Sequence, residues 1–302
     1  MQLDRIARRF RIDRPRRFRL SQHDPADCCG LTLEKDEAKA MLAGGIARLT
    51  ELQQRLYASD RWSVLIVLQA MDAAGKDSLI KHVMSGVNPQ GVEVTSFKQP
   101  SAEELDHDFL WRIAKRLPER GRIGIFNRSH FEEVLTVRVH RDHLENERLP
   151  PALDGKNIWK HRFDDIRAFE QHLARNGTLI LKFFLNLSKG EQRKRFLDRI
   201  ERPDKHWKFS LNDVAERKLW PKYMAAYEDL IRETSRPLAP WYVVPADNKW
   251  FTRLVVVAAL VEALNRLDLA YPKVEGAALE ELHKARKALL TEKRQRPTRR
   301  QG

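Results

Sequence analysis

The chain has 302 residues, of which 42% are hydrophobic and 32% are charged, a composition typical of a globular protein with a sizeable core. Its 56 Lys and Arg against 42 Asp and Glu give a net charge of +14, which favours an anionic partner such as a nucleic acid, a membrane surface or a polyanionic substrate. We expect neither a membrane span nor a signal peptide, because no apolar run approaches about 18 residues and residues 5–11 are strongly charged. Cys28 and Cys29 match no metal-binding or redox spacing, so we expect reduced thiols in the cytoplasm.

The positive charge lies partly in the two ends of the chain, at residues 5–19 and 284–300. The interior segment 193–208 is also basic, so the terminal segments alone do not account for the excess. We divide the chain into a basic, irregular segment of residues 1–30, a main domain of residues 31–272 and a basic C-terminal tail of residues 273–302.

Predicted strands and helices alternate along the main domain. Apolar or alternating runs predict strands at residues 64–68, 92–97, 123–126, 178–185 and 241–244. Apolar spacing and capping signals predict helices at residues 31–57 (weakened at Gly44 and Gly45), 76–84, 101–117, around 163–173, after 188, 213–233 and 252–267. This alternation indicates an α/β fold with a parallel sheet covered on both faces, and ligands in such sheets bind beyond the carboxyl ends of the strands.

The first loop of interest lies within residues 64–78, where an apolar run is followed by a small-residue turn, a Gly-Lys pair and a predicted helix. Loop N–H groups and a helix N-terminus can hold phosphate there, and Lys76 adds a cation. Ala70 and Asp77 depart from the pattern G-x-x-x-x-G-K-[ST], and a helix cap with a solvent-reaching lysine is the alternative. Asp72 indicates either a Mg²⁺ ligand or a local backbone cap, because a carboxylate among phosphate-binding amides is costly without a cation.

The second loop follows the strand at residues 123–126. Asn127 occupies a position at which phosphate-loop enzymes usually place a metal-binding Asp, and Arg128 directs a bidentate cation toward the same crevice. Glu132 and Glu133 lie one turn further on and can reach a metal or a nucleotide. His130 allows a phosphohistidine hypothesis, although a loop histidine is more often a structural residue.

The third feature is the basic helix after Ser188. Arg195, Arg199 and Arg202 share one face of this helix, and a solvated charge face is the simplest interpretation. The alternative is that residues 193–215 form a lid over phosphates.

Four stretches together resemble the polyphosphate kinase 2 family and follow the family's order over about residues 31–272. They are Gln-Ala-Met-Asp-Ala-Ala-Gly-Lys-Asp, Phe-Asn-Arg-Ser-His-Phe-Glu-Glu-Val-Leu, Arg-Pro-Asp-Lys-His-Trp-Lys-Phe-Ser and Ala-Pro-Trp-Tyr-Val-Val-Pro-Ala-Asp-Asn-Lys-Trp. The resemblance is greatest to the subgroup with Asn after the strand that leads into the second loop, here Asn127 after residues 123–126. This subgroup is similar to enzymes that phosphorylate both AMP and ADP. Ala74 and Ser78 stand where relatives often have glycine, which puts the backbone shape of the loop in question.

The resemblance implies a three-layer, thymidylate-kinase-like P-loop fold with a helical lid, Mg²⁺ (or Mn²⁺) as cofactor, and a homo-oligomer, often a tetramer. By matching positions it implies catalytic roles for Asp72, Lys76 and Arg128, with Asp72 and Asn127 on the metal. Further residues are expected to bind nucleotide or polyphosphate, namely Met71, Ala73, Ala74, Gly75, Asp77, Ser78, Lys81, Asn127, His130, Glu132, Arg193 and Arg199.

The expected activity is reversible phosphoryl transfer between inorganic polyphosphate and AMP or ADP, with guanine nucleotides as further candidates. An ATP-dependent nucleotide kinase is the nearest alternative, since it would share the phosphate loop and the lid. A nucleic-acid-binding P-loop protein is a weaker one, because the chain contains no recognisable nucleic-acid module.

Overall fold

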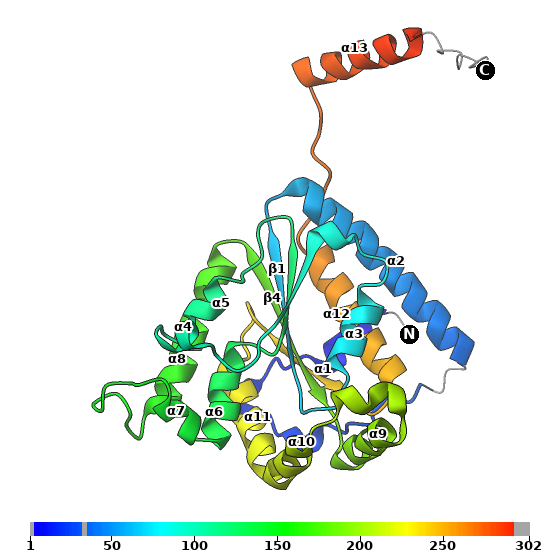
Figure 1. Cartoon of the computed structure of the whole chain (residues 1–302). Coiled ribbons are helices and arrows are strands. Elements are labelled where there is room, and N and C mark those ends of the chain that lie inside the picture. The colour runs from blue at the N-terminus through cyan, green and yellow to red at the C-terminus, as the bar shows by residue number, and fades with distance from the viewer. Residues whose placement is uncertain (1–2, 32–34, 293–302) are drawn as a thin grey trace, which may run out of the picture.

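A parallel five-stranded sheet forms the centre of the molecule (Figure 1), whose computed structural model describes residues 3–31 and 35–292. The strands run in the order β2-β3-β1-β4-β5, with β1 in the middle and parallel pairing throughout. Their bounds are β1 Ser63–Gln69, β2 Val92–Ser96, β3 Ile123–Asn127, β4 Thr178–Asn186 and β5 Trp241–Pro245. The sequence-based prediction of a parallel α/β sheet with these five strands is confirmed.

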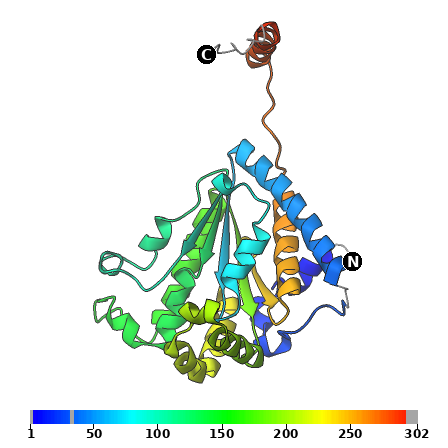
Figure 2. The same ribbon diagram turned by 45° about the vertical axis from the view of Figure 1, so that its right-hand side comes forward.

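Helices cover both faces of the sheet, which makes the fold three-layered (Figures 1 and 2). One face carries α1 Leu3–Phe10, α2 Lys35–Ser59, α3 Lys76–Val83 and α12 Lys249–Asn265. The other face carries α5 Trp111–Ala114, α8 Ile158–Arg175 and α11 Trp220–Thr234, and the short helices α4 Ala102–Leu105, α6 Thr136–Val139 and α7 Asp142–Glu145 lie on the same side.

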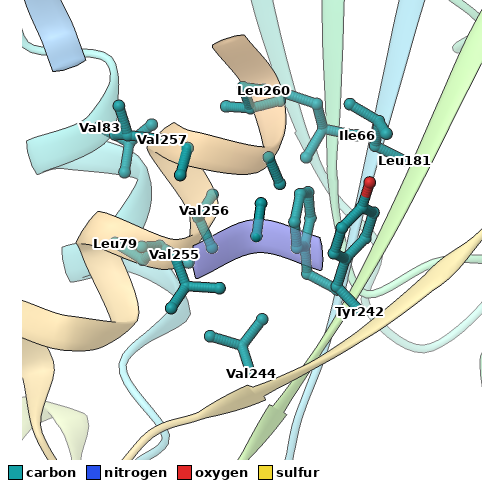
Figure 3. Close-up of a cluster of buried hydrophobic side chains, with 14 of the residues drawn as sticks. Ile66, Leu79, Val83, Leu181, Tyr242, Val244, Val255, Val256, Val257 and Leu260 are labelled. Carbon is teal, nitrogen blue, oxygen red and sulfur yellow. The ribbon is translucent and has the colours of Figure 1, made fainter. Parts of the chain in front are cut away.

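The central strand β1 is buried along its whole length and supplies both cores. Val64, Ile66 and Leu68 belong to the cluster under α2, α3 and α12, whereas Leu65 and Val67 point to the cluster under α8 and α11. This alternation is the period of two that a strand imposes on its side chains. Figure 3 shows the first cluster, in which side chains of the sheet meet those of α3 and α12.

The expectation of an irregular N-terminal segment is wrong for residues 3–10, which form α1, whereas residues 11–30 are irregular apart from two short 3₁₀ turns. Within α1, Ile6, Ala7 and Phe10 are buried against α12 and the sheet. Beyond α1, the amide of Ile12 donates to the carbonyl of Trp241 at 2.9 Å, so the segment pairs with the edge strand β5. The basic composition concealed the few apolar residues of α1, and the backbone of Arg11 and Ile12 protects an edge of the sheet that would otherwise be open.

Three predicted helices differ from the structure. The single helix expected at residues 213–233 is divided into α10 Leu211–Glu216, a 3₁₀ turn Arg217–Leu219 and α11. The helix expected at residues 101–117 has its capping box between Ser101 and Glu104 but ends at Leu105, and the side chain of Asp108 accepts from the amide of Leu110 where α5 begins. An Asp side chain that bonds to nearby backbone competes with helix continuation. In contrast, Gly44 and Gly45 do not interrupt α2, which packs along α12, and the first expected residues of that helix (32–34) lie outside the described part.

The basic region after β4 folds as α9 Lys189–Glu201, a 3₁₀ segment Pro203–Lys208 and α10 Leu211–Glu216. We call residues 193–215 of this region the lid segment. The expected C-terminal tail contains α13 Ala277–Thr291, which stands apart from the body at the end opposite α9 and α10 (Figures 1 and 2), and residues 293–302 lie outside the described part. Across the described residues, none of the helices combines the length and the apolar character needed to span a membrane.

Candidate active site

The carboxyl ends of the strands border a cleft of about 910 Å³, roofed by the lid segment. More cationic than acidic side chains line the cleft, and the acidic ones are Asp72, Asp77, Asp198 and Asp213. The cations come from six elements or loops and are Lys76, Lys98, Arg128, Arg195, Arg199, Lys205 and Lys249. Such a cleft attracts and concentrates anions.

The loop between β1 and α3 forms one wall of the cleft. Ala73 and Gly75 adopt left-handed backbone conformations, with φ of 64° and 101°, and α3 begins directly after Gly75. Ala74 and Ser78 are not among the positive-φ residues, so the absence of glycine there does not strain the loop. The Nζ atom of Lys76 donates to the carbonyl of Ala70 at 2.9 Å, and burial, together with the charge of Arg128, lowers the pKa of this lysine.

Two side-chain hydrogen bonds join this loop to the end of β3. The amide nitrogen of Asn127 donates to Asp77 Oδ1, and Nη2 of Arg128 donates to Asp72 Oδ1, both at 2.7 Å. The backbone of Arg128 is itself left-handed, with φ of 64°, and its amide donates to the carbonyl of Leu68 at 3.0 Å. The two loops that were predicted separately to carry the chemistry therefore form one rigid unit.

Glu132 fixes the guanidinium of Arg128 from the other side. Its Oε1 accepts from Gln69 at 2.9 Å, its Oε2 accepts from Thr136 at 2.6 Å, and Nη1 of Arg128 lies 4.0 Å from Oε2. The carboxylates of Glu132 and Asp72 raise the pKa of Arg128, with Glu132 the larger contributor. The cation is therefore permanent, and its orientation is set before any substrate binds.

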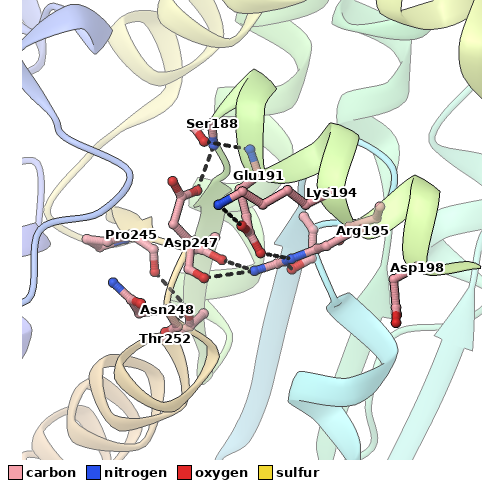
Figure 4. Close-up of polar contacts among 12 residues, drawn as sticks. Ser188, Glu191, Lys194, Arg195, Asp198, Pro245, Asp247, Asn248 and Thr252 are labelled. Atoms are coloured by element: carbon pink, nitrogen blue, oxygen red, sulfur yellow. Dashed lines mark hydrogen bonds and ion pairs between the residues drawn. The ribbon is translucent and has the colours of Figure 1, made fainter.

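Arg195 of α9, which the sequence analysis placed only on a charged helix face, has a central position at the site. It is buried, its Nε donates to Glu191 at 2.9 Å, and its two terminal nitrogens donate to backbone carbonyls of two loops (Figure 4). The acceptors are Ala73 at 3.2 Å, Ala74 at 2.9 Å, Ala246 at 2.7 Å and Asp247 at 3.1 Å. Arg195 therefore ties the phosphate loop to the loop after β5 and to α9.

The N-terminus of α9 is held by a variant of the predicted capping box. Ser188 accepts from the amide of Glu191 at 3.0 Å, as expected, but the amide of Ser188 donates to Asp247 at 2.8 Å (Figure 4). Asp247 takes the place of Glu191 because the Glu191 carboxylate is bound to Arg195. Spacing alone could not distinguish these two carboxylates.

Most of the predicted binding residues meet at the cleft, but five do not. Met71 and Glu132 line an adjoining cavity, and Lys81, Arg193 and His130 line neither. Lys81 is exposed on α3 and Arg193 is exposed on α9, and neither lines the cleft. His130 is 3% exposed and borders a smaller cavity of about 230 Å³. Burial lowers its pKa, its Nε2 lies 3.8 Å from Glu170, and neither ring nitrogen has a hydrogen-bond partner among the described residues. His130 is therefore a core residue beneath the Arg128 loop, which argues against a phosphohistidine role.

The cleft also contains residues that the sequence reasoning left without a role. Lys98 lies two residues after the end of β2, and Lys249 is the first residue of α12 after β5, so the rule that ligands bind beyond strand ends could have found both. Arg253, one turn further along α12, donates to the hydroxyl of Ser78 at 3.2 Å. Nothing in the local sequence placed Arg253 beside the phosphate loop.

A second cavity, of about 450 Å³, adjoins the cleft and shares Asp72, Arg128 and Asp213 with it. Met71 and Glu132 also line this cavity, together with His140 directly after α6, His143 of α7, and Tyr223 and Tyr227 of α11. The Asp72–Arg128 pair therefore stands at the junction of two compartments, a geometry that lets two bound molecules meet.

A magnesium ion would find a partial ligand set here. No three His, Cys, Asp or Glu side chains among residues 3–31 and 35–292 converge as a metal cluster. However, Mg²⁺ typically uses one or two protein groups and completes its shell with water and phosphate oxygens. Asp72 and Asn127 at the cleft fit that requirement, because the hydrogen bond from Arg128 occupies only one oxygen of Asp72 and Asn127 bonds to Asp77 through its nitrogen.

Known proteins share this sequence and architecture. A protein of Rhodopseudomonas palustris named ADP-polyphosphate phosphotransferase is 54% identical over 257 residues, which are 85% of this chain and 89% of that protein. A protein of Meiothermus ruber named AMP/ADP-polyphosphate phosphotransferase is 45% identical over 271 residues, 90% of this chain and 97% of that protein. The crystal structure of polyphosphate kinase 2 from Arthrobacter aurescens superposes with a TM-score of 0.85 at 40% identity and covers 93% of this chain and 96% of its own. The family model described as polyphosphate kinase 2 matches residues 32–271, and the chain belongs to that family.

Proposed function

We propose that the chain transfers phosphoryl groups reversibly between inorganic polyphosphate and AMP or ADP. The observation that carries this proposal is the Asp72–Arg128 pair at the junction of two cavities, the larger of which is lined with cations. The names of the relatives from Rhodopseudomonas palustris and Meiothermus ruber state the same substrates for those proteins.

The cation-lined cleft suits a polyphosphate chain. A linear polyanion repeats its charge along its length, and the cleft supplies several cations, from Lys76 of the phosphate loop to Lys205 of the lid segment. The second cavity, with its aromatic and imidazole side chains, suits the nucleotide, whose base can stack on flat rings. This arrangement brings the terminal phosphates of both substrates to Arg128.

The chemistry needs no general base, since the attacking oxygen of a nucleotide phosphate is already ionised at neutral pH. The protein has to hold two polyanions in line and to stabilise charge on the group in transit. Lys76 and Arg128 are placed for that electrostatic role, and Glu132 and Asp72 keep the guanidinium fixed so that little reorganisation is required.

We further propose that Mg²⁺, or Mn²⁺ in its place, is the cofactor. Asp72 and Asn127 would hold the ion, and it would neutralise phosphate charge between the two substrates. Removal of the divalent ion with EDTA should abolish transfer, and added Mg²⁺ should restore it. Full transfer with EDTA present would reject the metal.

The lid segment supports a closing step. Trp207 is 77% exposed and Leu211 is 81% exposed, although both belong to the part of the molecule that covers the cleft. We propose that the segment moves inward over bound polyphosphate and excludes water, which would otherwise accept the phosphoryl group. Quenching of Trp207 fluorescence on addition of polyphosphate would report this movement.

The direct test supplies donor and acceptor in the absence of ATP. Purified protein is incubated with Mg²⁺, long-chain polyphosphate and either ADP, AMP or GDP, and the nucleotides are resolved by chromatography. Formation of ATP from ADP that depends on polyphosphate supports the proposal, and the AMP and GDP reactions define the acceptor range. An ATP-dependent nucleotide kinase can form ATP from ADP alone, by converting two ADP to ATP and AMP, so equal ATP formation with and without polyphosphate would end the proposal.

Family resemblance also leads us to propose a cytoplasmic homo-oligomer, with a tetramer as the expected form. Light scattering coupled to size-exclusion chromatography measures the mass directly. A monomer at every concentration tested would reject this part of the proposal.

A further inference from the structure

Gln192 is a buried amide on α9 that lies behind the phosphate loop. It is 1% exposed and does not line the cleft. Its Nε2 donates to the main-chain carbonyl of Asp72 at 2.8 Å, and its Oε1 accepts from Nη1 of Arg217 at 2.5 Å. An arginine side chain cannot accept a hydrogen bond, so the amide satisfies both partners in this orientation only. Gln192 therefore connects Arg217 to the residue that stands at the junction of the two cavities.

Arg217 joins the two ends of the lid segment. Gln192 directly precedes this segment, and Arg217 follows its last residue by two positions, at the start of the 3₁₀ turn between α10 and α11. The same Nη1 also donates to the carbonyl of Lys189, the first residue of α9, at 3.1 Å. A cationic donor polarises the amide that accepts from it, which strengthens the hydrogen bond that the amide donates in turn.

The carbonyl that Gln192 holds belongs to the first peptide of the left-handed turn in the phosphate loop. Ala73 has a φ of 64°, a conformation that is unfavourable for a residue with a Cβ and persists only where surrounding contacts impose it. These contacts come from α9, because Gln192 binds the carbonyl of Asp72 and Arg195 binds those of Ala73 and Ala74. One helix therefore holds three successive carbonyls of the loop.

The carbonyl contacts determine where the N–H groups of the loop point. The C=O of one residue and the N–H of the next lie on opposite sides of a trans peptide, and the described residues contain no cis peptide bond. The N–H of Ala73 is thus directed away from Gln192, and the N–H of Gly75 away from Arg195. Both residues line the cleft, and within the described structure neither N–H donates to a protein acceptor. These two N–H groups can therefore bind a phosphate.

We propose that Gln192 is a positioning residue for phosphoryl transfer and that Arg217 makes its action depend on the lid. With the ends of the lid segment joined, the amide of Gln192 is polarised and fixed, and the Asp72 peptide presents the N–H of Ala73 to the donor phosphate. Loss of the Arg217 bond leaves the amide able to rotate and the left-handed turn supported by Arg195 alone. This role rests on the transfer activity proposed above and links the lid to the phosphate loop within it.

Variants of the full-length protein test the linkage through ATP formation that depends on polyphosphate. Gln192→Met fills a similar space without the amide donor, so kcat/KM for polyphosphate should fall about tenfold to 100-fold while KM for ADP stays within about twofold. Arg217→Met should give a smaller loss in the same constant, and Arg217→Lys, which keeps a cationic donor, should recover most of it. Lys218→Met, at an exposed neighbour in the same turn, is the control and should leave both constants unchanged.

The double variant distinguishes a linked pair from two independent contacts. If Arg217 acts through Gln192, then Gln192→Met combined with Arg217→Met should be no slower than Gln192→Met alone, because the second change removes a bond that is already lost. Fully additive losses would overturn the linkage. A lower kcat for Gln192→Met with an unchanged KM for polyphosphate would overturn the positioning role, because a smaller folded fraction gives that result.

Binding of tripolyphosphate without nucleotide keeps this test separate from the proposed activity. Isothermal titration calorimetry should give a dissociation constant for Gln192→Met about tenfold above that of the wild type. If the wild type binds tripolyphosphate but forms no ATP, the proposed transfer fails, whereas the effect of Gln192 on the phosphate loop is still measured. Equal dissociation constants for the wild type and Gln192→Met would overturn the role of Gln192 whatever the activity.

Discussion

Replacement of Arg195 by Met should damage both the stability and the activity of this protein. Methionine retains the length and apolar stem of the arginine but cannot donate to the carbonyls of the two loops. The phosphate loop would then lose its tie to the loop after β5, because Arg195 donates to both. This variant therefore tests whether a buried guanidinium, rather than the loop sequence, sets the shape of the phosphate cradle.

The magnitude follows from the acceptors that would be left without a donor. Ala74 and Ala246 are 4% and 1% exposed, so water has little access to replace the lost hydrogen bonds at their carbonyls. Each buried polar group left unpaired costs about 1–3 kcal/mol, and some relaxation is expected, so the free energy of unfolding should fall by about 2–4 kcal/mol. A displacement of about 1 Å at the phosphate loop would lower the rate of transfer by roughly 100-fold.

The matched control is Lys194→Met, at the adjacent position of α9. Its side chain is 81% exposed and makes only a surface ion pair with Glu191, so its loss should cost less than about 1 kcal/mol. Urea unfolding gives the stability of both variants, and ATP formation from ADP and polyphosphate is measured well below their melting temperatures. If Arg195→Met and Lys194→Met behave alike in both assays, Arg195 does not organise the site.

Other variants follow from the same contacts. Lys76→Ala should lower transfer at least about 100-fold, while Lys81→Ala on the same helix should leave it within a few-fold, and similar rates for the two would reject the cleft assignment. Arg128→Lys should fall at least about tenfold in kcat/KM, because an ammonium cannot replace the planar fork that Asp72 and Glu132 orient, and wild-type kinetics would contradict this. Lys182 donates to Glu170 at 2.6 Å inside the core, so Lys182→Met should lower the free energy of unfolding by about 3–5 kcal/mol because it leaves Glu170 charged and buried. Adding Glu170→Gln should restore much of that loss in urea titrations. If the double variant shows no recovery, the two residues do not stabilise the fold as a pair. Burial lowers the pKa of His130, so below about pH 6.5 the folded protein binds fewer protons than the unfolded chain and loses stability as the pH falls. The free energy of unfolding of His130→Gln should therefore fall less between about pH 7.5 and 5.5 than that of the wild type. Identical losses in the two proteins would contradict a buried, neutral His130.

Local sequence was sufficient for the sheet and for the first two loops of the site. The apolar run at residues 64–68, the Gly75-Lys76 pair and the Asn127-Arg128 pair each follow directly from short-range patterns, and parallel strands necessarily bring their carboxyl ends to one edge. For the same reason Asp72, Lys76 and Arg128 could be expected to share a cleft. The helical lid could be inferred from a charged segment between two strands.

The sequence could not show which members of a charged or polar group face inward. Arg193, Arg195 and Arg199 have similar neighbours along α9, yet Arg193 faces solvent, Arg195 is buried between two loops and Arg199 lines the cleft. Only the packing of α9 against the loops after β1 and β5 decides among them. His130 shows the same effect in reverse, because a polar loop residue was drawn into the core by its neighbours Phe131 and Phe169.

The amino-acid sequence by itself determined the parallel sheet, the phosphate loop and the excess of positive charge, since each depends on residues that are adjacent or regularly spaced. Tertiary structure alone decided that the basic N-terminal residues cover the edge of β5, that Arg195 holds the phosphate loop, and that the Asp72–Arg128 pair separates two cavities. These features join residues that lie 50 to more than 200 positions apart, and no local pattern encodes such contacts.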